Sequence, residues 1–128
     1  MRIAIDTNRY RDFCDARQDA VGRFKTASQI CMPFTVLAEL RAGFECGTLA
    51  RKNEGALCKF LNSPRVTILY ANEQTTFHYA RTYRQLREQG TPIPTDDIWI
   101  AALVQQHNLL LYSRDSHFDV LPQLARAN

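Results

Sequence analysis

Short apolar segments alternate with longer amphipathic segments along the chain. The short segments are rich in aliphatic and β-branched residues and predict strands at residues 1–5, 29–33, 66–70 and 109–112. Between them, apolar residues recur every three or four positions, which predicts helices at residues 9–14, 19–27, 36–44, 49–61, 73–88 and 98–107. This alternation is typical of an α/β domain, in which a short, mostly parallel sheet lies between two layers of helices.

One predicted helix is unusual because it is almost entirely apolar. Residues 98–104 read Ile-Trp-Ile-Ala-Ala-Leu-Val, so we expect this helix to lie inside the core. Thr95 or Asp96 is predicted to cap its N-terminus, since a short side-chain oxygen can accept a free backbone N–H there. Asp97 then stands at the edge of the core, where a carboxylate must be paired, hydrogen-bonded or bound to a metal.

Length and composition restrict the class of protein. A chain of 128 residues with 45% hydrophobic residues suits a single domain spanning residues 1–128. No run of about 18 apolar residues predicts a membrane span, and no signal peptide is recognisable, so we expect a cytoplasmic protein. The four cysteines form no CxxC pair, which disfavours a zinc site and favours reduced thiols that mostly pack in the interior.

The positive charge of the chain comes from arginine. The net charge is +3, with 13 Arg and 3 Lys. A guanidinium donates paired hydrogen bonds to phosphate, although a charge of +3 alone does not predict nucleic-acid binding. Arg9, Arg11 and Arg114 are candidates for phosphate contact because they lie next to acidic residues of interest.

Four acidic residues follow predicted strands or open predicted helices: Asp6, Glu39, Asp97 and Asp115. Functional groups in open parallel sheets gather beyond the C-terminal ends of the strands, so we expect these carboxylates to meet at one edge. Like charges held that close raise one another's pKa, and a Mg²⁺ or Mn²⁺ ion relieves the conflict because it prefers oxygen ligands. Such a site beside arginine predicts hydrolysis of a phosphodiester.

Each acid also has a purely structural interpretation. Asp6 could cap a helix, Glu39 could lie on a solvated helix face, and Asp115 could be a turn residue. A non-catalytic binding module is therefore the alternative function.

Other catalytic patterns are absent from the sequence. There is no GxSxG, P-loop or GxGxxG motif. The histidines form no helical pair and are predicted at surface or helix-end positions: His78, His107 and His117.

Four segments resemble the motifs of PIN-domain ribonucleases, and in particular of the VapC-type toxins of toxin–antitoxin pairs. They lie at residues 3–8, 36–43, 93–102 and 111–118, in the order found in that family. The resemblance implies a three-layer α/β/α PIN-like fold and an endoribonuclease that depends on Mg²⁺ or Mn²⁺. It also implies an RNA substrate, a cognate antitoxin protein that covers the site, and a homodimer.

Carried over position by position, the resemblance implies catalytic and metal-binding roles for four residues: Asp6, Glu39, Asp97 and Asp115. Of these, Asp6 and Asp97 are expected to be direct ligands. Asn8 and Ser113 match polar positions that could orient water or a ligand.

The sequence departs from the family pattern at two acidic positions. Asp96 stands where Asn is common, which leaves open whether Asp96 or Asp97 reaches the ion. The fourth acid of the family is variable, and Asp119 is an alternative to Asp115.

Overall fold

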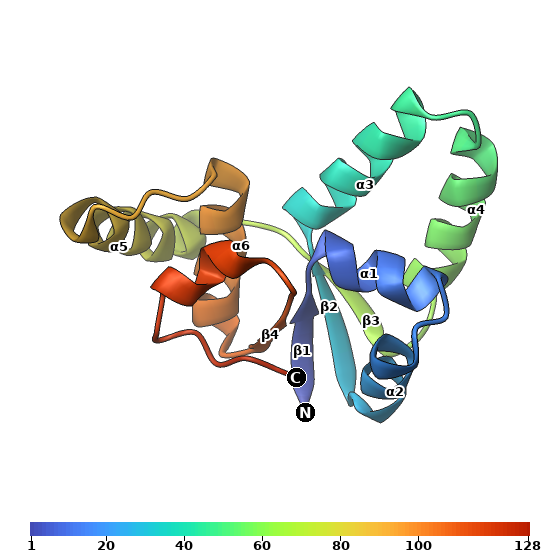
Figure 1. Ribbon diagram of the computed structural model, residues 1–128, viewed down its shortest axis with the longest axis horizontal. Helices are drawn as coiled ribbons and strands as arrows, with labels where there is room; N and C mark the ends of the chain where they lie inside the picture. Colours follow the sequence, from blue (N-terminus) through green and yellow to red (C-terminus); the bar gives the residue numbers. More distant parts are fainter.

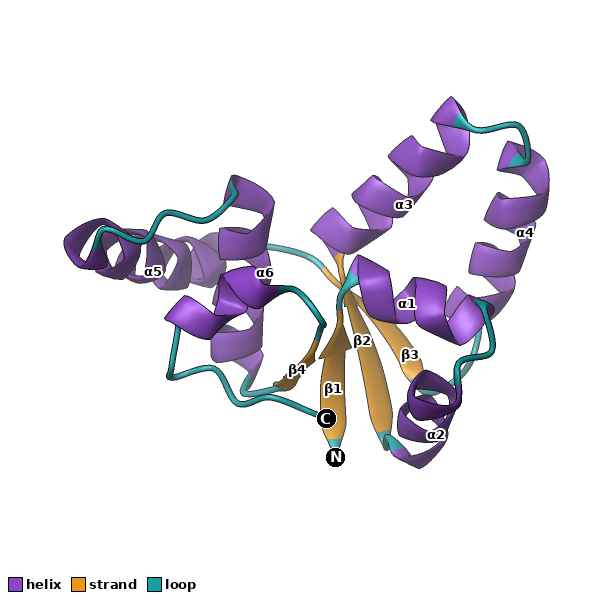
Figure 2. Ribbon diagram, viewed as in Figure 1, coloured by secondary structure: helices purple, strands orange, loops and turns teal.

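The computed structural model describes residues 1–128 and contains four strands, six α-helices and one short 3-10 helix. Figure 2 shows how helices flank the strands. In chain order the elements are β1 (Arg2–Ile5), α1 (Thr7–Cys14), α2 (Gln18–Thr26), β2 (Gln29–Pro33), α3 (Phe34–Cys46), α4 (Ala50–Leu61), β3 (Val66–Leu69), α5 (Glu73–Gln89), α6 (Thr95–His107), β4 (Leu110–Tyr112) and η1 (Ser116–Val120). Every predicted strand and helix is present, and η1 lies in a segment for which neither a strand nor a helix is predicted.

The strands form one parallel sheet in the order β3-β2-β1-β4. From β1 the chain adds β2 and β3 on one side of the sheet, and it later returns to add β4 on the other side of β1 (Figure 1). The boundary between β1 and β4 is thus a topological switch point, where crevices open beyond the C-terminal strand ends. Ile5 pairs with Tyr112 at that end, so the residues that follow the two strands emerge side by side.

Helix α6 is part of the core, as its apolar sequence predicts. Seven of its residues, including Asp97, are buried. The predicted cap is wrong: the N-cap is Pro94, and no side chain caps the helix. The carbonyl of Pro94 accepts hydrogen bonds from the N–H groups of Asp97 and Ile98, so Thr95 and Asp96 already belong to the first turn.

The six helices form two groups on either side of the strands (Figure 1). Helices α5 and α6 pack together on the left of Figure 1, and α1 to α4 lie on the right, with the α3–α4 pair extending away from the strands. No helix combines the length and the apolar character needed to cross a membrane.

All four cysteines are free thiols, but only Cys31 is buried, so the expectation that most of them pack in the interior is wrong.

Candidate metal centre

A polar pocket of about 550 Å³ lies at the C-terminal edge of the sheet. None of its 13 lining residues is hydrophobic, and they include all four acids expected from the sequence, Asp6, Glu39, Asp97 and Asp115. Four distant segments therefore reach one pocket, as the parallel topology predicts.

Asp6 connects β1 to α1, where it caps the helix and also lines the acidic pocket. It is the N-cap of α1, where its Oδ1 accepts a hydrogen bond of 2.8 Å from the N–H of Thr7. Its other oxygen, Oδ2, accepts a hydrogen bond of 2.6 Å from the hydroxyl of Ser113. Burial raises the pKa of Asp6, while the hydrogen bonds from Ser113 and Thr7 lower it in part. Capping and pocket formation are thus compatible, because each uses a different carboxylate oxygen.

Asp97 is held in the first turn of α6 and is only 9% exposed. Burial, followed by the neighbouring charge of Asp115, raises the pKa of Asp97 to about 6. Asp97 is therefore the carboxylate in this pocket that most needs a positive partner.

Asp115 and His117 come from the turn that follows β4. The Oδ1 of Asp115 accepts a hydrogen bond of 2.9 Å from the N–H of His117, which folds the imidazole back towards the pocket. The Nδ1 of His117 lies 2.9 Å from Oδ2 of Asp97 and 3.1 Å from Oδ1 of Asp115. Burial alone would lower the pKa of His117, but the charges and hydrogen bonds of Asp115 and Asp97 raise it. The imidazole thus supplies the only positive partner that these two carboxylates have.

One potential ligand atom from each of Asp97, Asp115 and His117 lies within 4.8 Å of the other two. Two carboxylate oxygens and an imidazole nitrogen suit a divalent cation, and the nitrogen favours ions such as Mn²⁺ over Mg²⁺. The donor set, the burial of Asp97 and the mutual repulsion of the two acids fit a metal site on physical grounds.

Sequence reasoning missed His117 and gave it a surface role. The side chain is indeed 49% exposed, but it faces the two acids. The signal was the Asp-x-His spacing in the turn after the last strand, which a search for helical pairs does not detect.

Asp6 and Glu39 line the pocket without joining that group of three. Glu39 lies in the second turn of α3 and is exposed. Asp6 is adjacent, since its charge also raises the pKa of Asp97, but its oxygens are already engaged by Thr7 and Ser113. The structure thus brings two of the four predicted acids together with a histidine and leaves the other two around them.

The two alternatives left open by the sequence differ in position. Asp96 is exposed and lines the pocket beside Asp97, but it does not belong to the group of three. Asp119 lies outside the pocket lining and pairs with Arg126 at 3.2 Å. Asp115, rather than Asp119, is therefore the acid that the last motif brings to the site.

Asn8 and Ser113 join the two strand ends beneath the acids. The hydroxyl of Ser113 donates to Asp6 and accepts a hydrogen bond of 3.0 Å from the N–H of Asp115. The side-chain oxygen of Asn8 accepts a hydrogen bond of 3.1 Å from the N–H of Arg114. Both side chains therefore fix the turn that carries Asp115 against the start of α1.

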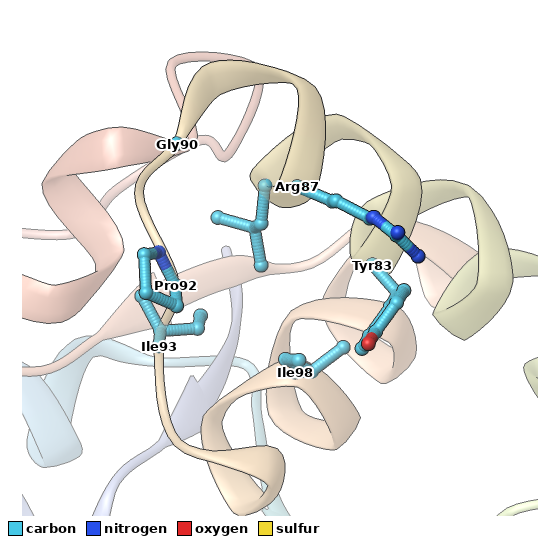
Figure 3. Close-up of a pocket in the computed structure, with 7 residues that line it drawn as sticks. Tyr83, Arg87, Gly90, Pro92, Ile93 and Ile98 are labelled. Atoms are coloured by element: carbon cyan, nitrogen blue, oxygen red, sulfur yellow. The ribbon is translucent and has the colours of Figure 1, made fainter.

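A second cavity, of about 310 Å³, lies between the end of α5 and the start of α6 (Figure 3). It is lined by Leu86 and by the six residues that Figure 3 labels, Tyr83, Arg87, Gly90, Pro92, Ile93 and Ile98. This lining contains no carboxylate, cysteine or histidine, so the acidic pocket is the stronger candidate for catalysis.

The family model and the similar proteins found by comparison point to the same family. The sequence model of the family described as PIN domain matches residues 3–124. Ribonuclease VapC1 of Haemophilus influenzae strain R2866 is 38% identical over 55 residues, which are 43% of this chain and 41% of that protein. The chain thus matches less than half the length of that relative. Ribonuclease VapC2 of H. influenzae strain KW20 / Rd is 30% identical over 98 residues, covering 76% of this chain and 73% of the relative.

The same fold occurs in solved structures. The structure of VapBC2 from Rickettsia felis, bound to a DNA fragment from the promoter, includes a chain that superposes with a TM-score of 0.87 at 25% identity. The superposition covers 100% of this chain and 98% of that one. The predicted three-layer α/β/α fold is therefore confirmed.

Proposed function

We propose, on the premise that this chain belongs to the PIN-domain family, that it is a metal-dependent endoribonuclease and the toxin of a toxin–antitoxin pair. The observation that carries the proposal is the convergence of Asp97, Asp115 and His117 in a pocket without hydrophobic lining. The relatives named ribonuclease VapC1 and VapC2 support RNA as the substrate.

Asp97, Asp115 and His117 would hold the cation, and Mg²⁺ or Mn²⁺ is the ion that this chemistry favours. Asp6 and Glu39 line the same pocket and would add negative charge around the cation. When bound, a divalent cation offsets the charge of the carboxylates and of an incoming phosphate and makes water a better nucleophile. Ser113 and Asn8 keep the β1 and β4 ends in register, which holds the acids at fixed separations.

The partners follow from the same proposal. A cognate antitoxin protein would bind this chain and cover the acidic pocket. The chain itself would act as a homodimer in the cytoplasm, where its RNA substrate is found. The solved structure that includes VapBC2 of R. felis supports a protein partner for this fold. The family match over residues 3–124 supports a single PIN-like domain across residues 1–128.

The competing function is a catalytically inactive module that binds RNA or an antitoxin-like peptide. Such a module needs no cation at Asp97, so its RNA binding should be independent of Mn²⁺. Asp97 is buried among other acids with only the half-exposed His117 as a positive partner, which favours a bound cation and therefore the catalytic function.

The test is cleavage of a mixed pool of single-stranded RNA by the purified full chain, with Mg²⁺ or Mn²⁺ titrated from zero. Wild type is expected to cleave only with the ion, and Asp97→Asn is expected to lose cleavage while remaining folded. Asp119→Asn is the matched control because it removes an exposed carboxylate outside the pocket. Cleavage at the wild-type rate by Asp97→Asn, or equal cleavage in a chelator, would overturn the proposal.

A further inference from the structure

A buried carboxylate that the sequence analysis did not single out organises the basic side of the pocket. Asp12 lies on α1, is only 3% exposed and contributes to the pocket lining. Its partners are arginines: Arg114 at 2.8 Å, Arg9 at 3.2 Å and Arg17 at 3.9 Å. The hydrogen bond from Arg114 is the main cause of a lowered pKa, so Asp12 is ionised at neutral pH.

Asp12 binds Arg114 through one edge of the guanidinium only. Nε of Arg114 donates to Oδ2 of Asp12, and Nη2 donates to Oδ1, both at 2.8 Å. A guanidinium has five N–H donors, and this arrangement uses two of them. The outer edge, formed by Nη1 and the second hydrogen of Nη2, remains free for a second bidentate partner. Phosphate oxygens match the spacing of that edge.

Arg114 is held both at its backbone, by Asn8, and at its guanidinium, by Asp12. Its backbone N–H donates to the side chain of Asn8 at 3.1 Å. Beneath Asp12, the guanidinium of Arg9 lies 4.2 Å from the centre of the Tyr112 ring and is almost buried. The side chain of Arg114 is nevertheless 49% exposed and lines the pocket next to Asp115. Little conformational freedom is left to lose when a ligand arrives.

Another arginine of the pocket lacks this support. Arg11 also lines the pocket, but it is exposed and makes no ion pair. Ordering its long side chain on a ligand would cost conformational entropy that Arg114 has already lost in the fold.

We propose that Arg114 binds a phosphate group of the RNA beside the acidic cluster, and that Asp12 is the positioning residue that orients it. This inference rests on the proposed function, since it names the residue that recognises the substrate backbone at the same site. The competing explanation is a purely structural pair that ties the β4 turn to α1. That explanation requires Arg114 and Asp12 to matter for stability but not for RNA affinity.

The experiment measures binding of a short fluorescein-labelled single-stranded RNA of mixed sequence by anisotropy at several salt concentrations. It uses the full chain with Ca²⁺ in place of Mn²⁺ so that cleavage is avoided. The variants are Arg114→Gln, Arg114→Lys and Asp12→Asn. The matched control is Arg84→Gln, which removes an arginine paired with Glu88 on the exposed side of α5.

Arg114→Gln is expected to weaken RNA binding by about tenfold, the size of one charge-assisted contact. It should also reduce the slope of log affinity against log salt by about 0.7, because one phosphate contact to a single strand is lost. Arg114→Lys should keep that slope but bind more weakly than wild type, since lysine lacks the planar fork. Asp12→Asn should likewise keep the slope, because the charge of Arg114 remains, while KM for cleavage rises.

Equal RNA affinity and equal salt slope in Arg114→Gln and Arg84→Gln would overturn the inference, even if Arg114→Gln melts at a lower temperature. Failure of the proposed function is distinguishable, because wild type itself would then not cleave RNA with Mn²⁺. A wild type that cleaves, together with an Arg114→Gln variant that binds RNA normally, rejects only the role of Arg114.

Discussion

The hydroxyl of Ser113 donates a hydrogen bond of 2.6 Å to Oδ2 of Asp6, although 107 positions separate the two residues. The contact is possible because Ile5 and Tyr112, which precede them, are paired in the parallel register of β1 and β4. The same oxygen of Ser113 accepts the N–H of Asp115, so one hydroxyl joins two of the acids.

Ser113→Ala is expected to loosen this junction. It leaves Asp6 and the N–H of Asp115 without their shared partner, and the loss of such contacts costs about 1–2 kcal/mol. The pKa of Asp6 should rise further, because the hydrogen bond from Ser113 now lowers it. Thermal unfolding compared with Ser116→Ala, an exposed serine nearby, checks this expectation. Equal melting temperatures for the two variants would contradict it.

Asp97→Asn should stabilise the protein when no metal is added. The folded pKa of Asp97 is about 6 against an ordinary value of 3.8, so the fold binds its proton more tightly than the unfolded chain does. The ionised group therefore destabilises wild type progressively as the pH rises from about 4 to 6, by about 3 kcal/mol in total. Asn removes that charge, so the variant should melt at a higher temperature than wild type at pH 7.

Added Mn²⁺ should reverse this order, because only wild type retains the full ligand set and is stabilised by the ion. Melting curves at pH 7 with and without Mn²⁺ measure both effects. A metal-free Asp97→Asn variant that is less stable than wild type would show that the carboxylate is better compensated than its surroundings indicate.

His117→Gln is expected to weaken Mn²⁺ binding by about tenfold and Mg²⁺ binding less, since an imidazole nitrogen contributes more to the transition metal. Calorimetric titration of both ions into the protein measures this difference. His107→Gln serves as the control because His107 ends α6 outside the pocket lining. Unchanged Mn²⁺ affinity in His117→Gln would exclude the histidine as a ligand.

Glu39→Gln should reduce metal affinity less than Asp115→Asn. Glu39 is exposed and outside the group of ligand atoms within 4.8 Å, whereas Asp115 belongs to it. The same titration ranks the two variants. A larger loss for Glu39→Gln would mean that α3 moves towards the acids when the ion binds.

Asp12→Asn should lower stability at neutral pH by about 1–3 kcal/mol, because the almost buried guanidinium of Arg9 and the half-exposed guanidinium of Arg114 lose a charged partner. The folded pKa of Asp12 is below its ordinary 3.8, so the pair stabilises the fold above about pH 4. That contribution disappears as the pH falls through the lower folded value. The difference in melting temperature between wild type and Asp12→Asn should therefore be full at pH 7 and shrink below about pH 4. A constant difference across that range would assign the effect to packing.

Much of the fold could be predicted because its signals are local. Each strand is a short apolar run, and the core helix α6 is apolar on nearly every face. Helix starts were harder, since Pro94 occupies the position expected for a capping side chain of Thr95 or Asp96. Capping depends on the backbone angles at one residue, and composition alone does not determine them.

The sequence by itself determined the alternation of strands and helices and the presence of an acid beyond the strands that form the pocket. A parallel sheet then had to bring those acids to one edge, because the C-terminal ends of its strands share that edge. Only the tertiary structure decided which acids come close enough to share an ion. Side-chain direction and turn geometry place His117 between Asp97 and Asp115, and they leave Glu39 at the pocket wall. Coordination and ion pairing depend on separations of a few ångströms, and for residues far apart in the chain those separations arise only from packing.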